Sequence, residues 1–159
     1  MSVVRDILHS YRAPRQVFRT RLGDSAREDR ALAVLMGACL LIFAAQWPRL
    51  SRQAFETGQD LSALLGGALF GWLFIAPLAF YAIALVTHML ARLFGARGSA
   101  YGARFALFWA LLCASPLWLF WGLVAGFIGT GPALSLVGFV ALLAFLMFWV
   151  INLRQAEWG

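Results

Sequence analysis

The chain has 159 residues, of which 62% are hydrophobic and 13% charged, and its mean hydropathy is +0.79. Soluble domains are about 45–50% apolar and about 25% charged, so this composition excludes a soluble globular protein and predicts an integral membrane protein. The net charge is +6, and all 13 basic residues are arginine. Because no soluble domain presents these arginines, nucleic acid is not an expected partner, whereas membrane lipids with anionic headgroups are.

Residues 1–25 are expected to form a short amphipathic helix and its connection to the membrane. Apolar side chains recur there at helical spacing, polar and charged ones lie between them, and Pro14 ends the pattern. The apolar stripe consists of Val3, Val4, Ile7, Leu8 and Tyr11. Such a stripe either lies on the cytoplasmic leaflet or docks against a helical bundle, and the sequence leaves both roles open.

Four apolar segments follow within residues 26–159, each long enough to cross a bilayer. The first is expected to begin near Ala26, because Ser25 and Glu28 have the spacing of a capping box, and to end at Pro48. The sequence predicts an all-α fold, a polytopic membrane bundle of about four transmembrane helices. The expected spans are residues 26–47, 61–93, 105–128 and 133–153.

Two prolines fall near the middle of expected spans. Pro77 lies in the second span, which begins after the predicted N-cap Asp60, and Pro116 lies in the third. Each proline removes one helical hydrogen bond and bends its helix, and Ser115 is expected to bond to a backbone group that Pro116 leaves free. Bent helices either pack around one another or enclose a cavity, and the scarcity of polar residues favours packing.

Two pairs of glycines have the Gly-xxx-Gly spacing that lets helices approach closely in lipid. Gly67 and Gly71 belong to the second span, and Gly122 and Gly126 belong to the third. Such a pair either packs a helix inside the bundle or forms the face of a homo-oligomer. Both outcomes are expected alternatives for these four residues.

Most of the arginines fall on one side of the expected topology, and only Arg49 and Arg52 fall on the other. The positive-inside rule therefore predicts that both termini are cytoplasmic. The arginines on the cytoplasmic side are expected to be Arg5, Arg12, Arg15, Arg19, Arg21, Arg27, Arg30, Arg92, Arg97, Arg104 and Arg154.

The spans carry little that resembles a catalytic site. No aspartate, glutamate or arginine lies in the central part of a span, where pumps and intramembrane hydrolases place such groups. There is no His-Glu-x-x-His array, His88 stands alone near the end of its span, and Ser115 has no evident base. We therefore expect no enzymatic activity, no cofactor and no metal.

Gly98-Ser99-Ala100-Tyr101, followed by Phe105-Ala106-Leu107-Phe108-Trp109-Ala110 and Cys113-Ala114-Ser115-Pro116, resembles the central signature of the Yip domain family, the Ypt/Rab-interacting membrane proteins. Pro14 with Phe18, and the end from Val150 to Arg154, are similar to the elements that flank this signature. The family is drawn with about five spans and acts in vesicle trafficking with small GTPases in eukaryotes, and it supplies no catalytic residue.

The resemblance implies a bacterial-type Yip protein, in a bacterial inner membrane. Tyr101 lies where an anchor at the membrane interface is expected, or where a partner would bind. The expected function is that of a non-enzymatic scaffold or accessory subunit that binds other membrane proteins or shapes the bilayer. The alternative is a small facilitator that moves lipid or solute through a cavity between the bent helices.

Overall fold

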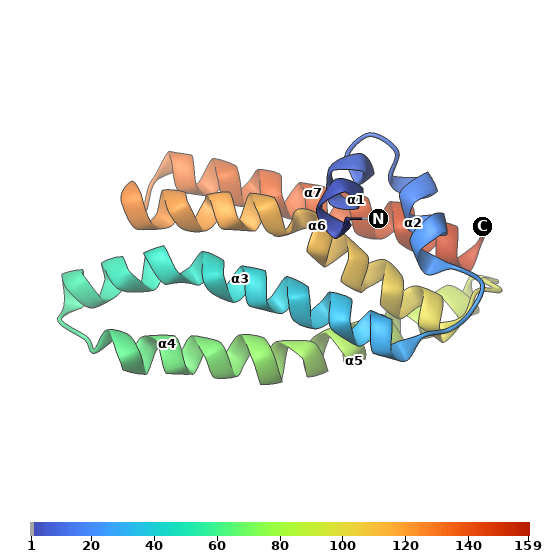
Figure 1. Cartoon of the computed structure of the whole chain (residues 1–159), viewed down its shortest axis with the longest axis horizontal. Helices are drawn as coiled ribbons and strands as arrows, with labels where there is room; N and C mark the ends of the chain where they lie inside the picture. Colours follow the sequence, from blue (N-terminus) through green and yellow to red (C-terminus); the bar gives the residue numbers. More distant parts are fainter. Residues whose placement is uncertain (1) are drawn as a thin grey trace.

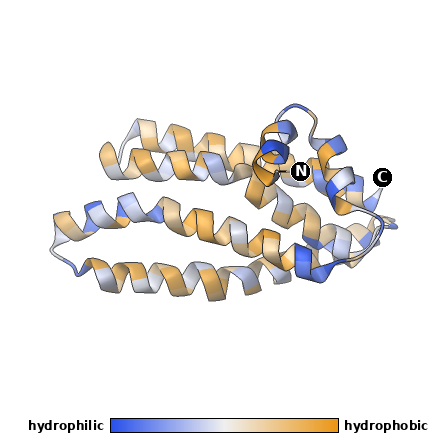
Figure 2. Ribbon diagram, in the orientation of Figure 1, coloured by the Kyte–Doolittle hydropathy of each residue, from blue (hydrophilic) through white to orange (hydrophobic). Residues whose placement is uncertain are grey.

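A computed structural model describes residues 2–159, and that range is built of helices without strands. Four long helical segments run side by side, and the short helices α1 (Val3–Ser10) and α2 (Pro14–Leu22) lie over α6 and α7 toward one end of the bundle (Figure 1). Each long segment is apolar enough to cross a membrane, and hydrophobic residues run along all four (Figure 2). The predicted all-α membrane bundle with four transmembrane helices and an N-terminal amphipathic helix is confirmed.

Helix α3 (Glu28–Thr57) is longer than the first expected span at its C-terminal end. It contains 30 residues and is about 45 Å long. The capping box expected at Ser25 is wrong, because the helix starts after Arg27, whose side chain makes no capping bond. The end expected at Pro48 is also wrong, since the polar residues after it continue the helix. Gly58, in the left-handed conformation at φ +69°, ends it instead.

The second span is a continuous helical segment with a π-helical turn between two α-helices. It consists of α4 (Leu61–Phe70), the π-helical turn η1 (Gly71–Ile75) and α5 (Ala76–Leu93). The predicted N-cap Asp60 is confirmed, because the hydroxyl and the backbone N–H of Ser62 both donate to its carboxylate. These hydrogen bonds lower the pKa of Asp60. The π-helical turn ends two residues before Pro77, and the bend expected at Pro77 itself stays a prediction.

Helices α6 (Ala100–Phe127) and α7 (Pro132–Glu157) extend beyond the third and fourth expected spans by about one turn each at the end near the chain termini. Helix α6 starts early because Ser99 caps it: its Oγ accepts a hydrogen bond from the backbone N–H of Gly102 at 3.0 Å. Helix α7 continues past residue 153 because Arg154 and the residues after it are good helix formers.

The core of the molecule lies around the first half of α6. Apart from Arg104, every residue from 101 to 115 is buried, so protein surrounds this half on all sides. Helix α3 runs parallel to α6 along its length. An ion pair joins Glu28 to Arg104 at one end of the contact, and the backbone of Ala45 touches Gly122 near the other.

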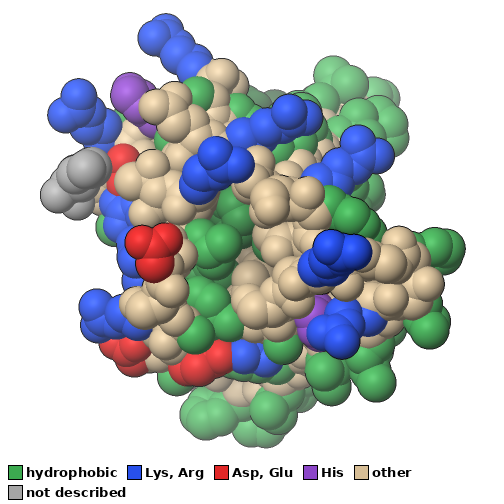
Figure 3. All heavy atoms as spheres, turned by 90° about the vertical axis from the view of Figure 1, so that its right-hand side faces the viewer, with side chains coloured by type: hydrophobic (Ala, Val, Ile, Leu, Met, Phe, Trp, Pro, Cys, Tyr) green, Lys and Arg blue, Asp and Glu red, His purple; other side chains and the backbone are tan. Residues whose placement is uncertain are grey.

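The two ends of the bundle differ in charge. We call the end formed by residues 2–30, 92–104 and 154–159 the basic end, because it contains eleven of the thirteen arginines and both described chain ends (Figures 1 and 3). The opposite end contains the turns at residues 58–60 and 128–131. The described chain ends and most arginines therefore lie at the same end of the bundle, and the prediction that this end is cytoplasmic stays a prediction.

Candidate functional site

The two N-terminal helices are docked on the buried half of α6. The Tyr11 hydroxyl donates to the carbonyl oxygen of Cys113 at 2.7 Å, and the Tyr11 ring meets Phe148 of α7 edge-on at 5.0 Å. Burial raises the pKa of Tyr11, which keeps the hydroxyl in its donating form. Phe18 of α2 is fully buried against Phe105. Residues 2–25 are thus part of the bundle rather than a free arm.

Arg21 adds a charged connection between these helices. Its guanidinium pairs with Asp6 of α1 and lies 5.5 Å from the ring centre of Trp109 in α6. Both members of the ion pair are mostly shielded from solvent, so the interaction is less screened than a surface pair. The pair and the cation–π contact together fix the angle between α1, α2 and α6.

The bend at Pro116 lies directly beneath this docking site. Pro116 has no N–H to give to the carbonyl of Leu112, and the Ser115 hydroxyl donates to that carbonyl instead, at 2.7 Å. The role predicted for Ser115 is confirmed. The next carbonyl, that of Cys113, accepts from Tyr11. The carbonyl that the proline leaves without its helical partner, that of Leu112, is therefore satisfied within α6, and Tyr11 of the N-terminal segment bonds to the carbonyl beside it.

Docking divides the predicted apolar stripe of α1 into two parts. Ile7 is buried and Tyr11 is bonded to the bundle, whereas Val4 and Leu8 are 66% and 64% exposed. The sequence leaves the membrane surface and the bundle open as sites for this stripe, and in the structure Ile7 and Tyr11 lie against the bundle. We call Val3, Val4 and Leu8 the outer face of α1; these exposed apolar side chains have no neighbouring helix over them.

Tyr101 does not occupy the interfacial position that was expected. It is buried, and its ring stacks on Phe105 at 5.9 Å between centres. Because Ser99 starts the helix early, Tyr101 lies inside the first turn of a helix that is surrounded by protein. The interpretation of Tyr101 as a membrane anchor is therefore wrong, and the residue belongs to the core.

The two glycine pairs have different surroundings. A Cβ atom on Gly122 would overlap the backbone of Ala45, and one on Gly126 would overlap Pro48, so this pair brings α6 against α3. Around Gly67 and Gly71, no described atom beyond the adjacent backbone of their own helix lies within 4 Å of such a Cβ position. Internal packing is thus the outcome for the second pair, and within one chain nothing in residues 2–159 lies against the first.

One buried polar contact was not found by sequence reasoning. His88 Nδ1 lies 2.6 Å from Glu157 Oε1, and the Glu157 side chain is completely buried. Gly98 allows this approach, because a side chain there would collide with Glu157. The contact fastens the end of α7 to α5. One sequence signal would have suggested this contact: a glutamate lies one turn beyond a long apolar run, and a lone histidine lies near the same end of another span.

Cavities in the described residues lie toward the ends of the bundle and between α1 and α2. No group of three or more metal-ligating side chains is found in residues 2–159. Both cysteines, Cys39 and Cys113, are buried free thiols. Comparison of the chain with protein-family models, with curated proteins and with solved structures finds no significant match.

Proposed function

We propose that this chain is a non-enzymatic membrane scaffold or accessory subunit of the Yip-domain type, which binds another membrane protein through the outer face of α1. One observation carries the proposal: Val4 and Leu8 are exposed on a helix that Ile7, Tyr11 and Phe18 hold rigidly against the bundle. A short helix bound to lipid alone would not need such fastening. A partner binds such a helix more tightly, because the conformational entropy of the helix is already lost when it docks on the bundle, before the partner binds.

The depth of the outer face supports a membrane-embedded partner. Tyr11 bonds to Cys113, which lies more than three turns inside α6, beyond the charged start of that helix. At this depth the neighbours of Val4 and Leu8 are lipid chains or the apolar side chains of another membrane protein. By the positive-inside rule we infer that the basic end faces the cytoplasm, with the outer face of α1 as the part of it that reaches into the leaflet. The resemblance to bacterial Yip proteins supports a bacterial inner membrane.

The packing around Pro116 favours a scaffold over a facilitator. Ser115 is buried, its hydroxyl is used within its own helix, and Tyr11 covers the neighbouring carbonyl. A conduit for solute needs unfilled polar positions along its length, whereas these positions are occupied. The N-terminal segment therefore packs beside Pro116, where the Tyr11 hydroxyl bonds to the carbonyl of Cys113.

Purification of the full chain in mild detergent tests the proposal. We expect the wild-type protein to retain a membrane-protein partner in fixed stoichiometry, and a variant with Val4→Asn and Leu8→Asn to lose it. The control is Leu93→Asn with Phe94→Asn, which changes two still more exposed apolar residues at the basic end. A protein isolated without a partner, carrying only lipid and unaffected by either variant, would favour the facilitator instead.

A further inference from the structure

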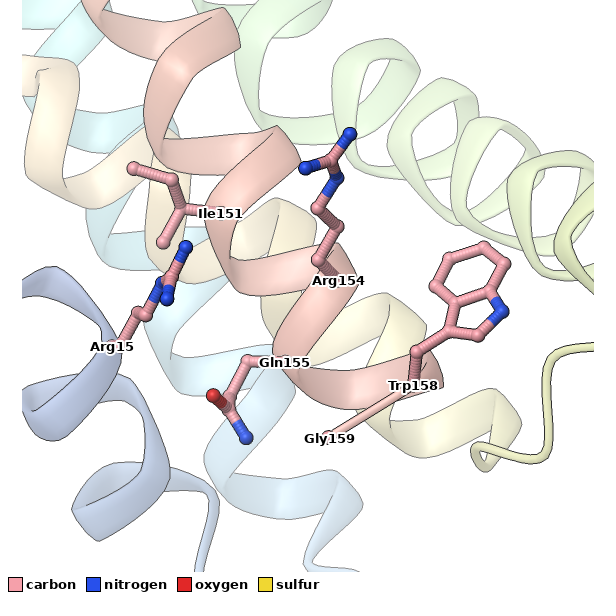
Figure 4. A pocket seen from close by; sticks show the side chains of 6 residues that line it. All are labelled: Arg15, Ile151, Arg154, Gln155, Trp158 and Gly159. Atoms are coloured by element: carbon pink, nitrogen blue, oxygen red, sulfur yellow. The ribbon is translucent and has the colours of Figure 1, made fainter.

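A pocket opens at the basic end where α2 meets the end of α7, away from the contacts that dock α1. Its volume is about 530 Å³. Figure 4 shows the side chain of Arg15 reaching from α2 toward α7, on which Ile151 and Arg154 lie. The lining residues are Arg15, Ile151, Arg154, Gln155, Trp158 and Gly159.

The side chains that line the pocket carry two positive charges and no negative one, and the terminal carboxylate of Gly159 is the one acidic group beside them. Within residues 2–159, neither the Arg15 nor the Arg154 guanidinium takes part in an ion pair or a side-chain hydrogen bond. The acid nearest in sequence is Glu157, and its carboxylate is buried against His88. The two guanidinium groups therefore keep their hydrogen-bonding capacity for a ligand from outside the chain.

We propose that this pocket binds the phosphate group of an anionic phospholipid. A guanidinium presents two N–H groups in the geometry of two phosphate oxygens. Arg15 and Arg154 line the pocket from two helices, and because Figure 4 shows the Arg154 guanidinium turned away from Arg15, both hold one phosphate once the Arg154 side chain changes its rotamer. The Gln155 amide adds a neutral donor at the same rim. Basic pockets between helices at the cytoplasmic side of a membrane protein are suited to lipid headgroups.

The surface that leads out of the pocket identifies the ligand as a lipid rather than a soluble phosphate. Met147, Ile151, Arg154 and Trp158 follow one another at spacings of three and four along one face of α7. Met147 is 50% exposed, so an apolar track runs from the pocket along the membrane-facing side of the helix. Acyl chains fit along this track while the phosphate contacts the arginines, and Trp158 lies at the level of the headgroups.

Lipid binding to the purified full chain tests this site. The protein in neutral detergent is titrated with phosphatidylglycerol, with phosphatidylcholine and with inorganic phosphate, and bound lipid is counted by native mass spectrometry alongside the melting temperature. We expect phosphatidylglycerol to bind with a stoichiometry of one at low concentration. Arg15→Gln with Arg154→Gln should weaken this binding at least about tenfold, because charge-assisted hydrogen bonds are lost from two helices.

A double variant with Arg5→Gln and Arg92→Gln is the matched control, since it removes the same charge from the basic end and neither residue lines the pocket. It should bind phosphatidylglycerol as the wild type does. Equal weakening in both double variants would overturn the site in favour of a diffuse surface charge. Equal binding of phosphatidylcholine would overturn its selectivity, and equal stabilisation by inorganic phosphate would overturn the lipid assignment. The lipid-free melting temperature of each variant, expected to match wild type, shows that folding is intact.

Discussion

Replacing Gly122 with valine is expected to lower the free energy of unfolding in detergent by about 3 kcal/mol. The added side chain would collide with the backbone of Ala45 rather than with the movable end of a side chain. Helices α3 and α6 would have to separate along the contact that extends from Glu28 and Arg104 to Gly126. The expected result is a large fall in the melting temperature, followed by circular dichroism in the same detergent.

Gly67→Val is the matched control for this substitution. It makes the same change within an apolar helix, and beyond the adjacent backbone of that helix no atom of the described residues lies within 4 Å of the new Cβ position. We expect its unfolding free energy to stay within about 0.5 kcal/mol of wild type. If Gly122→Val and Gly67→Val were equally stable, the close α3–α6 contact would be absent from the folded protein. A change of oligomeric state in Gly67→Val alone would show that the exposed glycine pair is the face of a homo-oligomer.

Phe18→Ala is expected to release α1 and α2 from the bundle while the four spans remain folded. Phe18 is completely buried against Phe105, and removal of a buried phenylalanine side chain costs about 3–5 kcal/mol. The N-terminal helices are held by few other contacts, chiefly those of Tyr11 and Arg21. Trypsin cleavage after Arg19 and Arg21 should therefore accelerate about a hundredfold, as measured by the appearance of the shortened chain.

Phe55→Ala controls for the change in chemistry, because Phe55 is 91% exposed at the opposite end of α3. Its trypsin cleavage rate in residues 1–25 should equal that of the wild type. Slow cleavage in Phe18→Ala would mean that α2 is held by something other than the contact with Phe105.

The helical segments were predictable because each depends on local sequence. Length and hydropathy alone define four membrane-spanning segments, and Asp60 marks the start of the second through hydrogen bonds within its own turn. The ends were less predictable. Pro48 is compatible with a helix when polar residues continue beyond it, and Ser99 caps α6 ahead of the apolar run that suggested its start.

The docking of residues 2–25 could be predicted only in part. Helical spacing identifies the apolar stripe, but Ile7 and Leu8 are equally hydrophobic, and only contacts with α6 and α7 decide which is buried. The bond from Tyr11 to Cys113 joins residues far apart in the chain. The same holds for His88 with Glu157, since no local pattern specifies which ends of two helices meet.

Helix α1 is expected to be fixed on α6 with its outer face in the membrane. A fluorophore on a cysteine at position 8, in a full chain whose Cys39 and Cys113 are replaced by alanine, measures this directly in vesicles with brominated lipids. We expect bromine on the upper acyl chain to quench the fluorophore strongly at position 8 and weakly at the exposed polar position Gln16 of α2. Equal, weak quenching at both positions would contradict it, because the outer face would then lie in water.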